Sequence, residues 1–365
     1  MMVKEFTQLR RERITFALTL AVPVVQLLLF GYAINGDARQ LPAVVVAAEH
    51  GPLVRSTLAA AANTGYVRFV GQATGDEAER MLARGEVQLI VMVPAGFSRQ
   101  VLRGERPAIA AIVDATDPAA TGGLLSALAR LPEVALRHDL RPNDAMPVAG
   151  ATPFSLIVHR RYNPEGRASH NVVPGLMGVI LTMTLVMMTS MAMTREHERG
   201  TLENLLATPT RPVEILLGKT VPYLLIGSIQ VGIVFTAARW VFDVPMRGSL
   251  LALAAAVLLF MGATLAVGFL FSTLARSQLQ SMQLTMFYFL PNLLLSGFMF
   301  PFHGMPAWAQ AIGEVLPLTH FLRMARTIML KGLPASDLAV EAWPVLVFAL
   351  VAGALAIHRF RRTLD

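Results

Sequence analysis

Residues Arg195 to Lys219 read REHERGTLENLLATPTRPVEILLGK and form an island of charge between two long apolar runs. Four acidic and four basic side chains give this island a formal charge of about zero: Glu196, Glu198, Glu203 and Glu214 against Arg195, Arg199, Arg211 and Lys219. A loop that binds anionic lipid would be mostly Lys and Arg. Mixed charge beside an apolar stripe at helical spacing, Leu202, Leu205 and Leu206, instead favours docking to another protein. An ordinary solvated loop is the alternative.

Two motif fragments in the island point to chemistry that the full patterns do not support. Gly218, Lys219 and Thr220 end like a phosphate-binding loop, but Val213 stands where that pattern needs a glycine. His197 and Glu198 begin like a zinc-protease helix, but Thr201 replaces the second histidine. The sequence therefore predicts neither nucleotide nor zinc binding here.

The composition is that of a membrane protein. The 365 residues are 54% hydrophobic and 15% charged, whereas a soluble domain has about 25% charged residues. The net charge of +7 is interpreted as basic residues that anchor cytoplasmic helix ends, and nucleic-acid binding is not expected. Because the chain has no cysteine, it forms no disulfide and carries out no thiol chemistry.

Six apolar runs predict six membrane-spanning helices, with both basic termini in the cytoplasm. The first run follows a basic segment and exceeds the usual length of a signal-peptide core, so we expect an uncleaved helix rather than a signal peptide. The fifth is expected to be interrupted at Pro291 and Asn292. The predicted spans are 14–34, 172–193, 221–242, 249–271, 279–300 and 343–358.

Residues 37–168 contain more charge, Gly and Pro and no spanning run, which predicts an inserted extracytoplasmic domain. Alternating strand and helix patterns indicate an α/β fold with a largely parallel sheet. The tail 134–163 is expected to be an extended stalk. The predicted strands are 41–48, 66–70, 87–93 and 108–114, and the predicted helices are 53–62, 76–84, 97–103 and 119–131.

Two aspartates in this domain, Asp114 and Asp117, follow a predicted strand. They fit either a cation site or a turn in which Asp117 caps the next helix ahead of Pro118, and the cap is favoured.

Residues 301–321 follow the fifth span, and their apolar stretches are too short to cross a bilayer. We expect re-entrant or interfacial helices broken at Pro306 and Pro317, which makes Pro301, His303, Pro306, Trp308 and Pro317 a candidate outer gate. The lone His303 and His320 fit a metal pair or hydrogen-bonded interfacial residues, and the second reading is favoured. Three basic residues beyond this segment are expected beside nearby acids: Arg323, Arg326 and Lys331, with Glu314, Asp337 and Glu341.

Over nearly its whole length, the chain resembles the ABC type-2 transporter permeases of bacteria, in the six-helix subgroup with a large periplasmic insertion. Three stretches carry the resemblance: EHERGTLENLLATPTRPVEILLGK in the island, RYNPEGRASHNVVPGLMGVIL at the second span, and LLSGFMFPFHGMPAWAQAIGEVLPLTHFLRMARTIMLKG near the end.

The resemblance implies a bacterial inner-membrane exporter subunit that exports drugs or other amphipathic compounds. The partners it implies are a separate cytoplasmic ATPase, which would bind ATP and magnesium in place of this chain, and a second permease, identical or paralogous. Membrane lipid and a periplasmic adaptor are further candidate partners. The family's coupling helix falls within 195–209, on Glu198, Gly200, Thr201, Leu202, Glu203, Leu205 and Leu206. On this basis residues 1–36 form the N-terminus and first helix, and 169–365 the remaining membrane domain.

Two other functions compete with transport. A membrane receptor or sensor would use the outer domain to bind ligand, but the short tails offer no signalling domain. An intramembrane enzyme would need paired His, Asp, Glu or Ser side chains, and no predicted span carries such a set.

Overall fold

The computed structural model describes residues 24, 29, 37–137, 139–140, 152–198 and 212–362. The described residues divide into two compact units. The α/β unit comprises residues 37–171 together with 300–305, and the helical unit comprises 172–299 together with 306–362. An α/β domain inserted into a helical protein was expected, and the structure contains both kinds of fold.

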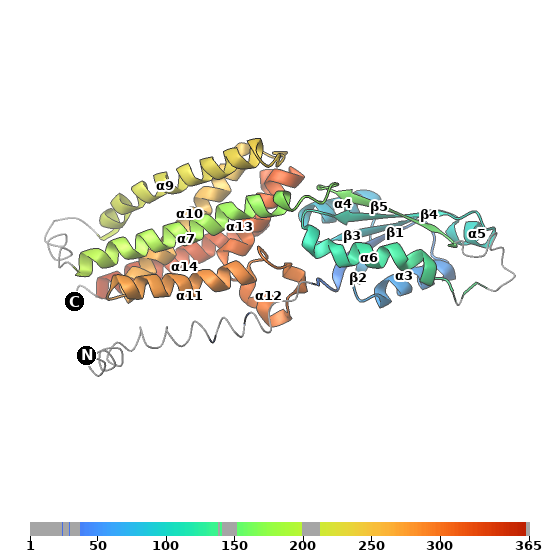
Figure 1. Ribbon diagram of the computed structural model, residues 1–365, viewed down its shortest axis with the longest axis horizontal. Helices are drawn as coiled ribbons and strands as arrows, with labels where there is room; N and C mark the ends of the chain where they lie inside the picture. Colours follow the sequence, from blue (N-terminus) through green and yellow to red (C-terminus); the bar gives the residue numbers. More distant parts are fainter. Residues whose placement is uncertain are drawn as a thin grey trace. The chain divides into compact units, whose positions relative to one another are not determined.

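The α/β unit is built on a five-stranded sheet in the order β2-β1-β3-β4-β5 (Figure 1). Three of its four strand pairings are parallel, and only β3 and β4 run antiparallel. The expectation of a largely parallel sheet is therefore confirmed. Its elements are β1 Leu41–Ala47, α3 Pro52–Asn63, β2 Val67–Gln72, α4 Gly75–Arg84, β3 Leu89–Val93, α5 Phe97–Leu102, β4 Ala108–Asp114, α6 Pro118–Val134 and β5 Ser155–Arg161.

Alternating side chains bury the two faces of this sheet against different helices. Leu89, Val91, Ile109 and Ala111 belong to a core with residues of α3, α5 and α6. On the opposite face, Val44 and Ile90 pack with Ala78 and Leu82 of α4. Because a strand points successive side chains to opposite faces, these near-continuous apolar runs are typical of strands covered on both sides.

One expectation for this unit is wrong. The predicted stalk includes β5, which pairs in parallel with β4 from Ala108 opposite Ser155 to Asp114 opposite Arg161. Leu156 and Val158 pack on the larger core, so these residues complete the sheet as an edge strand.

The helical unit contains the long helices α7, α9, α10 and α11, then several shorter elements, and ends on the long helix α14 (Figure 1). The final helix packs against α10 and α13. The elements of this unit are α7 Ala168–Glu198, α9 Pro212–Trp240, α10 Leu250–Leu274, α11 Gln278–Leu295, α12 Ala307–Gly313, α13 Pro317–Arg326, the π-helical turn η3 Thr327–Lys331, the 3-10 turn η4 Ala335–Leu338 and α14 Ala339–Arg362. The 3-10 turn η2, Phe302–Gly304, belongs to the α/β unit and contacts α6.

Four helices of the described chain are long and apolar enough to cross a membrane. These are 168–196 in α7, 220–240 in α9, 250–274 in α10 and 336–359, which includes most of α14. The predicted first span lies outside the described residues, apart from Val24 and Leu29. The predicted fifth span, α11, does not meet this standard, so the structure supports four of the six predicted spans.

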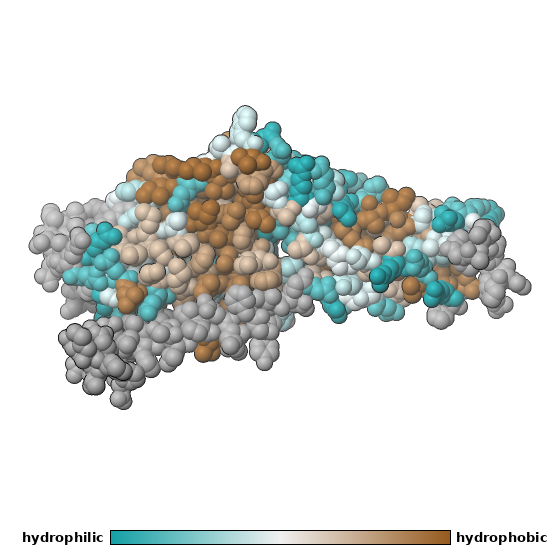
Figure 2. Space-filling view, viewed as in Figure 1, coloured by the Kyte–Doolittle hydropathy of each residue, from teal (hydrophilic) through white to brown (hydrophobic). Residues whose placement is uncertain are grey.

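Apolar side chains cover much of the face of the helical unit that Figure 2 shows. On α9, Leu225, Ile229 and Ile233 follow one face at four-residue spacing and are 61%, 62% and 64% exposed. A soluble monomer rarely exposes such a stripe, whereas lipid would cover it without cost. The exposed stripe is therefore typical of a helix that faces lipid.

The expected interruption of the fifth span at Pro291 and Asn292 is also wrong, because α11 continues through both residues to Leu295. Pro291 has no N–H to donate, but Asn292 donates a side-chain hydrogen bond to the Tyr288 carbonyl oxygen at 2.9 Å in the same turn. Such side-chain bonds and the packing of neighbouring helices allow proline within a membrane helix.

Candidate functional site

The charged island lies mostly outside the described residues. Of its predicted docking residues, only Glu198 is described, at the end of α7. Gly200, Thr201, Leu202, Glu203, Leu205 and Leu206 fall in the gap between 198 and 212, so their docking role stays a prediction.

Glu198 holds the start of α11. One carboxylate oxygen accepts a hydrogen bond from the backbone N–H of Gln278 at 2.8 Å, and the other accepts from the Gln278 side-chain amide at 2.6 Å. A carboxylate suits this place because the first N–H groups of a helix lack partners within the helix and carry partial positive charge. A residue of the island is therefore bound to a second long helix.

Further contacts between the same helices lie one and two turns before Glu198. The hydroxyls of Ser190 and Ser281 are hydrogen-bonded, and the Thr194 hydroxyl is 3.3 Å from that of Ser281. Ser190, Thr194 and Glu198 recur every four residues, so they share one face of α7. We call these three residues, with Gln278 and Ser281, the α7–α11 clasp.

Polar side chains also continue along α11 beyond the clasp. Thr285, Asn292 and Ser296 are at most 3% exposed. Within the described structure, the Asn292 Oδ1 and Ser296 Oγ atoms have no hydrogen-bond partner, and neither has Thr189 Oγ1 on α7. An unpaired buried polar atom costs about 1–3 kcal/mol, so such groups generally serve water, an ion or a ligand. We call Thr189, Asn292 and Ser296 the unpaired polar set.

The five residues of the predicted outer gate are divided between the two units. Pro301 and His303 belong to the α/β unit, whereas Pro306, Trp308 and Pro317 belong to the helical unit. The predicted helix breaks are confirmed, because Pro306 is the residue before α12 and Pro317 is the first residue of α13. A gating role for these five residues stays a prediction.

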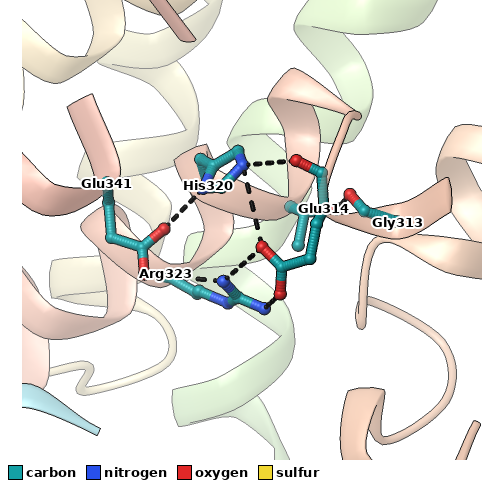
Figure 3. Close-up of polar contacts among 6 residues, drawn as sticks. Gly313, Glu314, His320, Arg323 and Glu341 are labelled. Carbon is teal, nitrogen blue, oxygen red and sulfur yellow. Dashed lines mark hydrogen bonds and ion pairs between the residues drawn. The ribbon is translucent and has the colours of Figure 1, made fainter. Parts of the chain in front are cut away.

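The same segment contributes to a charged cluster that joins three elements (Figure 3). His320 of α13 places Nδ1 2.6 Å from a carboxylate oxygen of Glu341 in α14, and Nε2 2.8 Å from the backbone carbonyl oxygen of Glu314 at the end of α12. Arg323 donates two hydrogen bonds to the Glu314 carboxylate at 3.1 and 2.6 Å and lies 3.5 Å from Glu341. Thr319 adds a 2.7 Å hydrogen bond to the Gly313 carbonyl oxygen.

The surroundings of His320 shift its protonation. Burial alone would lower the pKa of the imidazole, because it disfavours the charged form. The hydrogen bonds to Glu341 and to the Glu314 carbonyl, together with the negative charge of Glu341, outweigh that effect and raise the pKa above its ordinary value. The imidazole is therefore biased toward its charged form.

The structure distinguishes between the metal-binding and hydrogen-bonding interpretations of His320, and between the cation-site and helix-cap interpretations of Asp117. His320 is hydrogen-bonded, as favoured. The cap at Asp117 is confirmed, because its side chain accepts from the N–H groups of Ala119 and Ala120 at 3.0 and 3.3 Å. Asp114 is buried and accepts from Thr116.

The expectation that basic residues lie beside acids is confirmed for Arg323 with Glu314 and Glu341. The sequence did not predict that His320 joins this cluster. Its spacing of three from Arg323 places the two on one helix face, a signal that could have found it. Arg326 donates to the Gly297 carbonyl oxygen at 3.2 and 3.3 Å.

Comparison with known proteins identifies the family. A sequence model described as ABC-2 family transporter protein matches residues 13–358. The chain belongs to the ABC-2 family of transporter proteins. The match includes the helical unit, the α/β unit and the island between α7 and α9, so the family resemblance is not confined to a hydropathy pattern.

Named relatives align along most of the ABC-2 protein. It is 28% identical over 368 residues to the probable multidrug ABC transporter permease YbhS of Escherichia coli strain K12, an alignment that covers 100% of the chain and 96% of the relative. It is 27% identical over 364 residues to the probable multidrug ABC transporter permease YbhR of that strain, covering 98% and 96%. The inner membrane transport permease YhhJ of the same strain is 32% identical over 305 residues, covering 80% and 77%. The ABC-2 protein is therefore a membrane permease of an ABC transport system.

Proposed function

We propose that this ABC-2 protein is the membrane-spanning subunit of an exporter that moves an amphipathic or drug-like compound out of the cytoplasm. A separate cytoplasmic ATPase supplies the work, and a second permease, identical or paralogous, completes the pathway. The observation that carries the proposal is end-to-end similarity to two permeases named as probable multidrug transporters.

The interior of the helical unit supports passage of a substrate with polar groups. Thr189, Asn292 and Ser296 bring unpaired polar atoms to the interior of a unit whose outer surface is apolar. A compound with both apolar and polar parts could satisfy such atoms while its remainder contacts hydrocarbon side chains. This chemistry agrees with an amphipathic substrate and fits a purely aliphatic one less well.

The α7–α11 clasp supports coupling to an ATPase through the island. Glu198 of the island is the last residue of α7, and its carboxylate is bonded to the start of α11. A force applied to the island would therefore act on α7 and α11 together. In this proposal the island faces the cytoplasm, both termini lie on that side, and the α/β unit is extracytoplasmic.

The proposal can be tested by purifying the tagged full-length chain from its native host under mild detergent and identifying bound proteins by mass spectrometry. We expect an ABC ATPase in fixed stoichiometry with the wild-type chain. Leu205→Asp combined with Leu206→Asp, or Glu203→Arg alone, should release that ATPase while the chain still inserts into the membrane. Retention of the ATPase by both variants would contradict docking at the island.

The receptor alternative receives no support from the relatives named above, since their names describe transport. No contact in the described structure favours it over transport.

A further inference from the structure

His320 faces two hydrogen-bond acceptors. The Glu314 carbonyl oxygen can only accept a hydrogen bond, and the same holds for the Glu341 carboxylate when it is ionised. Nδ1 meets the Glu341 carboxylate at 2.6 Å, and Nε2 meets the Glu314 carbonyl oxygen at 2.8 Å. A neutral imidazole has one N–H group and could satisfy only one of these acceptors. The side chain is only 6% exposed, so an unmade bond there would be costly. Both contacts form together when both ring nitrogens carry hydrogen.

The guanidinium of Arg323 lies 3.5 Å from the other oxygen of the Glu341 carboxylate, so both acids of the cluster contact a basic side chain. With His320 protonated, the cluster has a net charge of zero. Its two positive groups are His320 and Arg323, and its two negative groups are Glu314 and Glu341. Neutral His320 would leave a net charge of −1 on the cluster, in which the His320 side chain is 6% and the Glu341 side chain 24% exposed.

Two of the elements that pack on α13, helices α10 and α7, add no charge to this cluster. Phe260 of α10 stacks on Phe321, and α10 carries no titratable side chain. Gly178 of α7 lies against Leu318 and Phe321, and α7 has no titratable residue between positions 171 and 194. Of the remaining neighbours, α11 carries Tyr288 and η3 carries Lys331, while Arg326 of α13 bonds to the Gly297 carbonyl.

We propose that His320 holds a proton as a buried imidazolium, and that this proton fastens the start of α14 to the end of α12 through α13. Glu314 follows the last residue of α12, and Glu341 lies in the first turn of α14. Loss of the proton places a nitrogen lone pair against an acceptor and leaves one excess negative charge. The start of α14 then separates from α13. The protein thus contains a proton-dependent latch on a candidate membrane helix, which we call the His320 latch.

The direction of the pH effect follows from the raised pKa of His320 in the folded protein. The stabilisation is fully present below the pKa of the released imidazole, about 6.5. It declines as the pH rises above that value and is lost once the pH exceeds the raised pKa of the closed state. The latch is therefore closed at mildly acid pH and opens toward alkaline pH.

Introduced cysteines can report the opening, because the natural chain contains none. Leu338 lies just before α14 and is only 8% exposed, so Leu338→Cys should react with a maleimide mainly when the latch is open. Val315 is 65% exposed, so Val315→Cys serves as a matched control that corrects for ionisation of the thiol. The full-length chain is reconstituted in lipid vesicles, and the ratio of the two labelling rates is measured from about pH 6 to about pH 9.5, a range that begins below the ordinary pKa of histidine.

We expect this ratio to rise about tenfold per pH unit above about pH 6.5, until the pKa of the closed state is passed. Adding His320→Gln should make the ratio high and independent of pH, whereas His303→Gln, the same substitution at another histidine, should preserve the wild-type profile. A ratio that stays constant over the whole pH range would overturn the proposal. An unchanged profile in His320→Gln would also overturn it, because another group would then be titrating.

Discussion

Glu198 and Gln278, separated by 80 residues in sequence, are joined by two hydrogen bonds between one carboxylate and both N–H donors of the glutamine, its backbone amide and its side-chain amide. This contact connects the end of α7 to the first residue of α11. It gives the charged island, where the resemblance places the coupling helix, a mechanical connection to two long helices.

Removal of the Glu198 carboxylate should weaken the coupling of ATP hydrolysis to transport. In Glu198→Ala both bonds disappear, and hydrogen bonds to a charged group contribute about 1.5–3 kcal/mol in general. Because this contact is exposed, we expect the lower end of that range, a fall of about tenfold or less in substrate moved per ATP hydrolysed. The measurement compares transport with hydrolysis in vesicles that contain the reconstituted complex.

A double-mutant cycle provides the control for this effect. Gln278→Ala removes the side-chain amide and retains the backbone N–H, so it should cause a smaller loss. Together with Glu198→Ala it should add little further loss, because the two side chains act through one contact. Fully additive losses would show that Glu198 acts elsewhere, for example directly on the ATPase.

Gly178 is required for the close approach of α7 to α13. A Cβ atom at this position would lie 2.6 Å from side-chain atoms of both Leu318 and Phe321, which are fully buried. Gly178→Ala should therefore destabilise the protein by about 1–3 kcal/mol through overpacking. The measurement is the thermal unfolding midpoint of the purified chain in detergent.

Gly262 on α10 is the matched control, because a Cβ atom added there would meet no other atom within 4 Å. Gly262→Ala should leave stability unchanged or raise it by up to about 1 kcal/mol, since alanine favours the helix. Equal midpoints for the two variants would contradict the assigned packing of α7 on α13.

The unpaired polar set should matter more to transport than to stability. Ser296→Ala removes a buried hydroxyl without a described partner, so the free energy of unfolding should be unchanged or about 1 kcal/mol higher. Transport of a polar amphipathic substrate should fall several-fold, since a substrate hydrogen bond contributes about 0.5–1.5 kcal/mol. The measurements are the unfolding midpoint in detergent and the rate of substrate uptake by vesicles that contain the complex.

Ser228→Ala, at an exposed position on α9, controls for the loss of a hydroxyl from a membrane helix. Transport and unfolding should both be near wild type in that variant. A Ser296→Ala variant with normal transport and reduced stability would assign the hydroxyl a structural role instead.

Local patterns predicted most of the α/β unit. Alternating strand and helix signals placed β1, β3, β4 and the helices between them, because these elements bury nearly continuous apolar residues. Strand β5 was missed because it lies between Pro153 and Pro164 and ends in His159, Arg160 and Arg161, features that suggest a solvated linker. An edge strand tolerates such residues because one side of it is exposed.

Contacts between distant residues were harder to predict than elements. The sequence indicated that Glu314 and Glu341 lie near Arg323. It did not show which face of α14 packs on α13, so the bond between His320 and Glu341 was not predicted. The bond between Glu198 and Gln278 was missed for the same reason. Helix periodicity shows which residues share a face, whereas only the packed structure shows which faces meet.

The most direct test of the proposed function is ATP-driven transport by the purified proteins. The chain and its co-purifying ATPase are reconstituted in vesicles, and accumulation of a fluorescent amphipathic cation is measured with the wild-type chain, with Leu205→Asp combined with Leu206→Asp, and with each protein alone. We predict accumulation that requires ATP and both proteins and that is lost in the double variant. ATP hydrolysis by the chain alone, or undiminished accumulation with the double variant, would contradict this prediction.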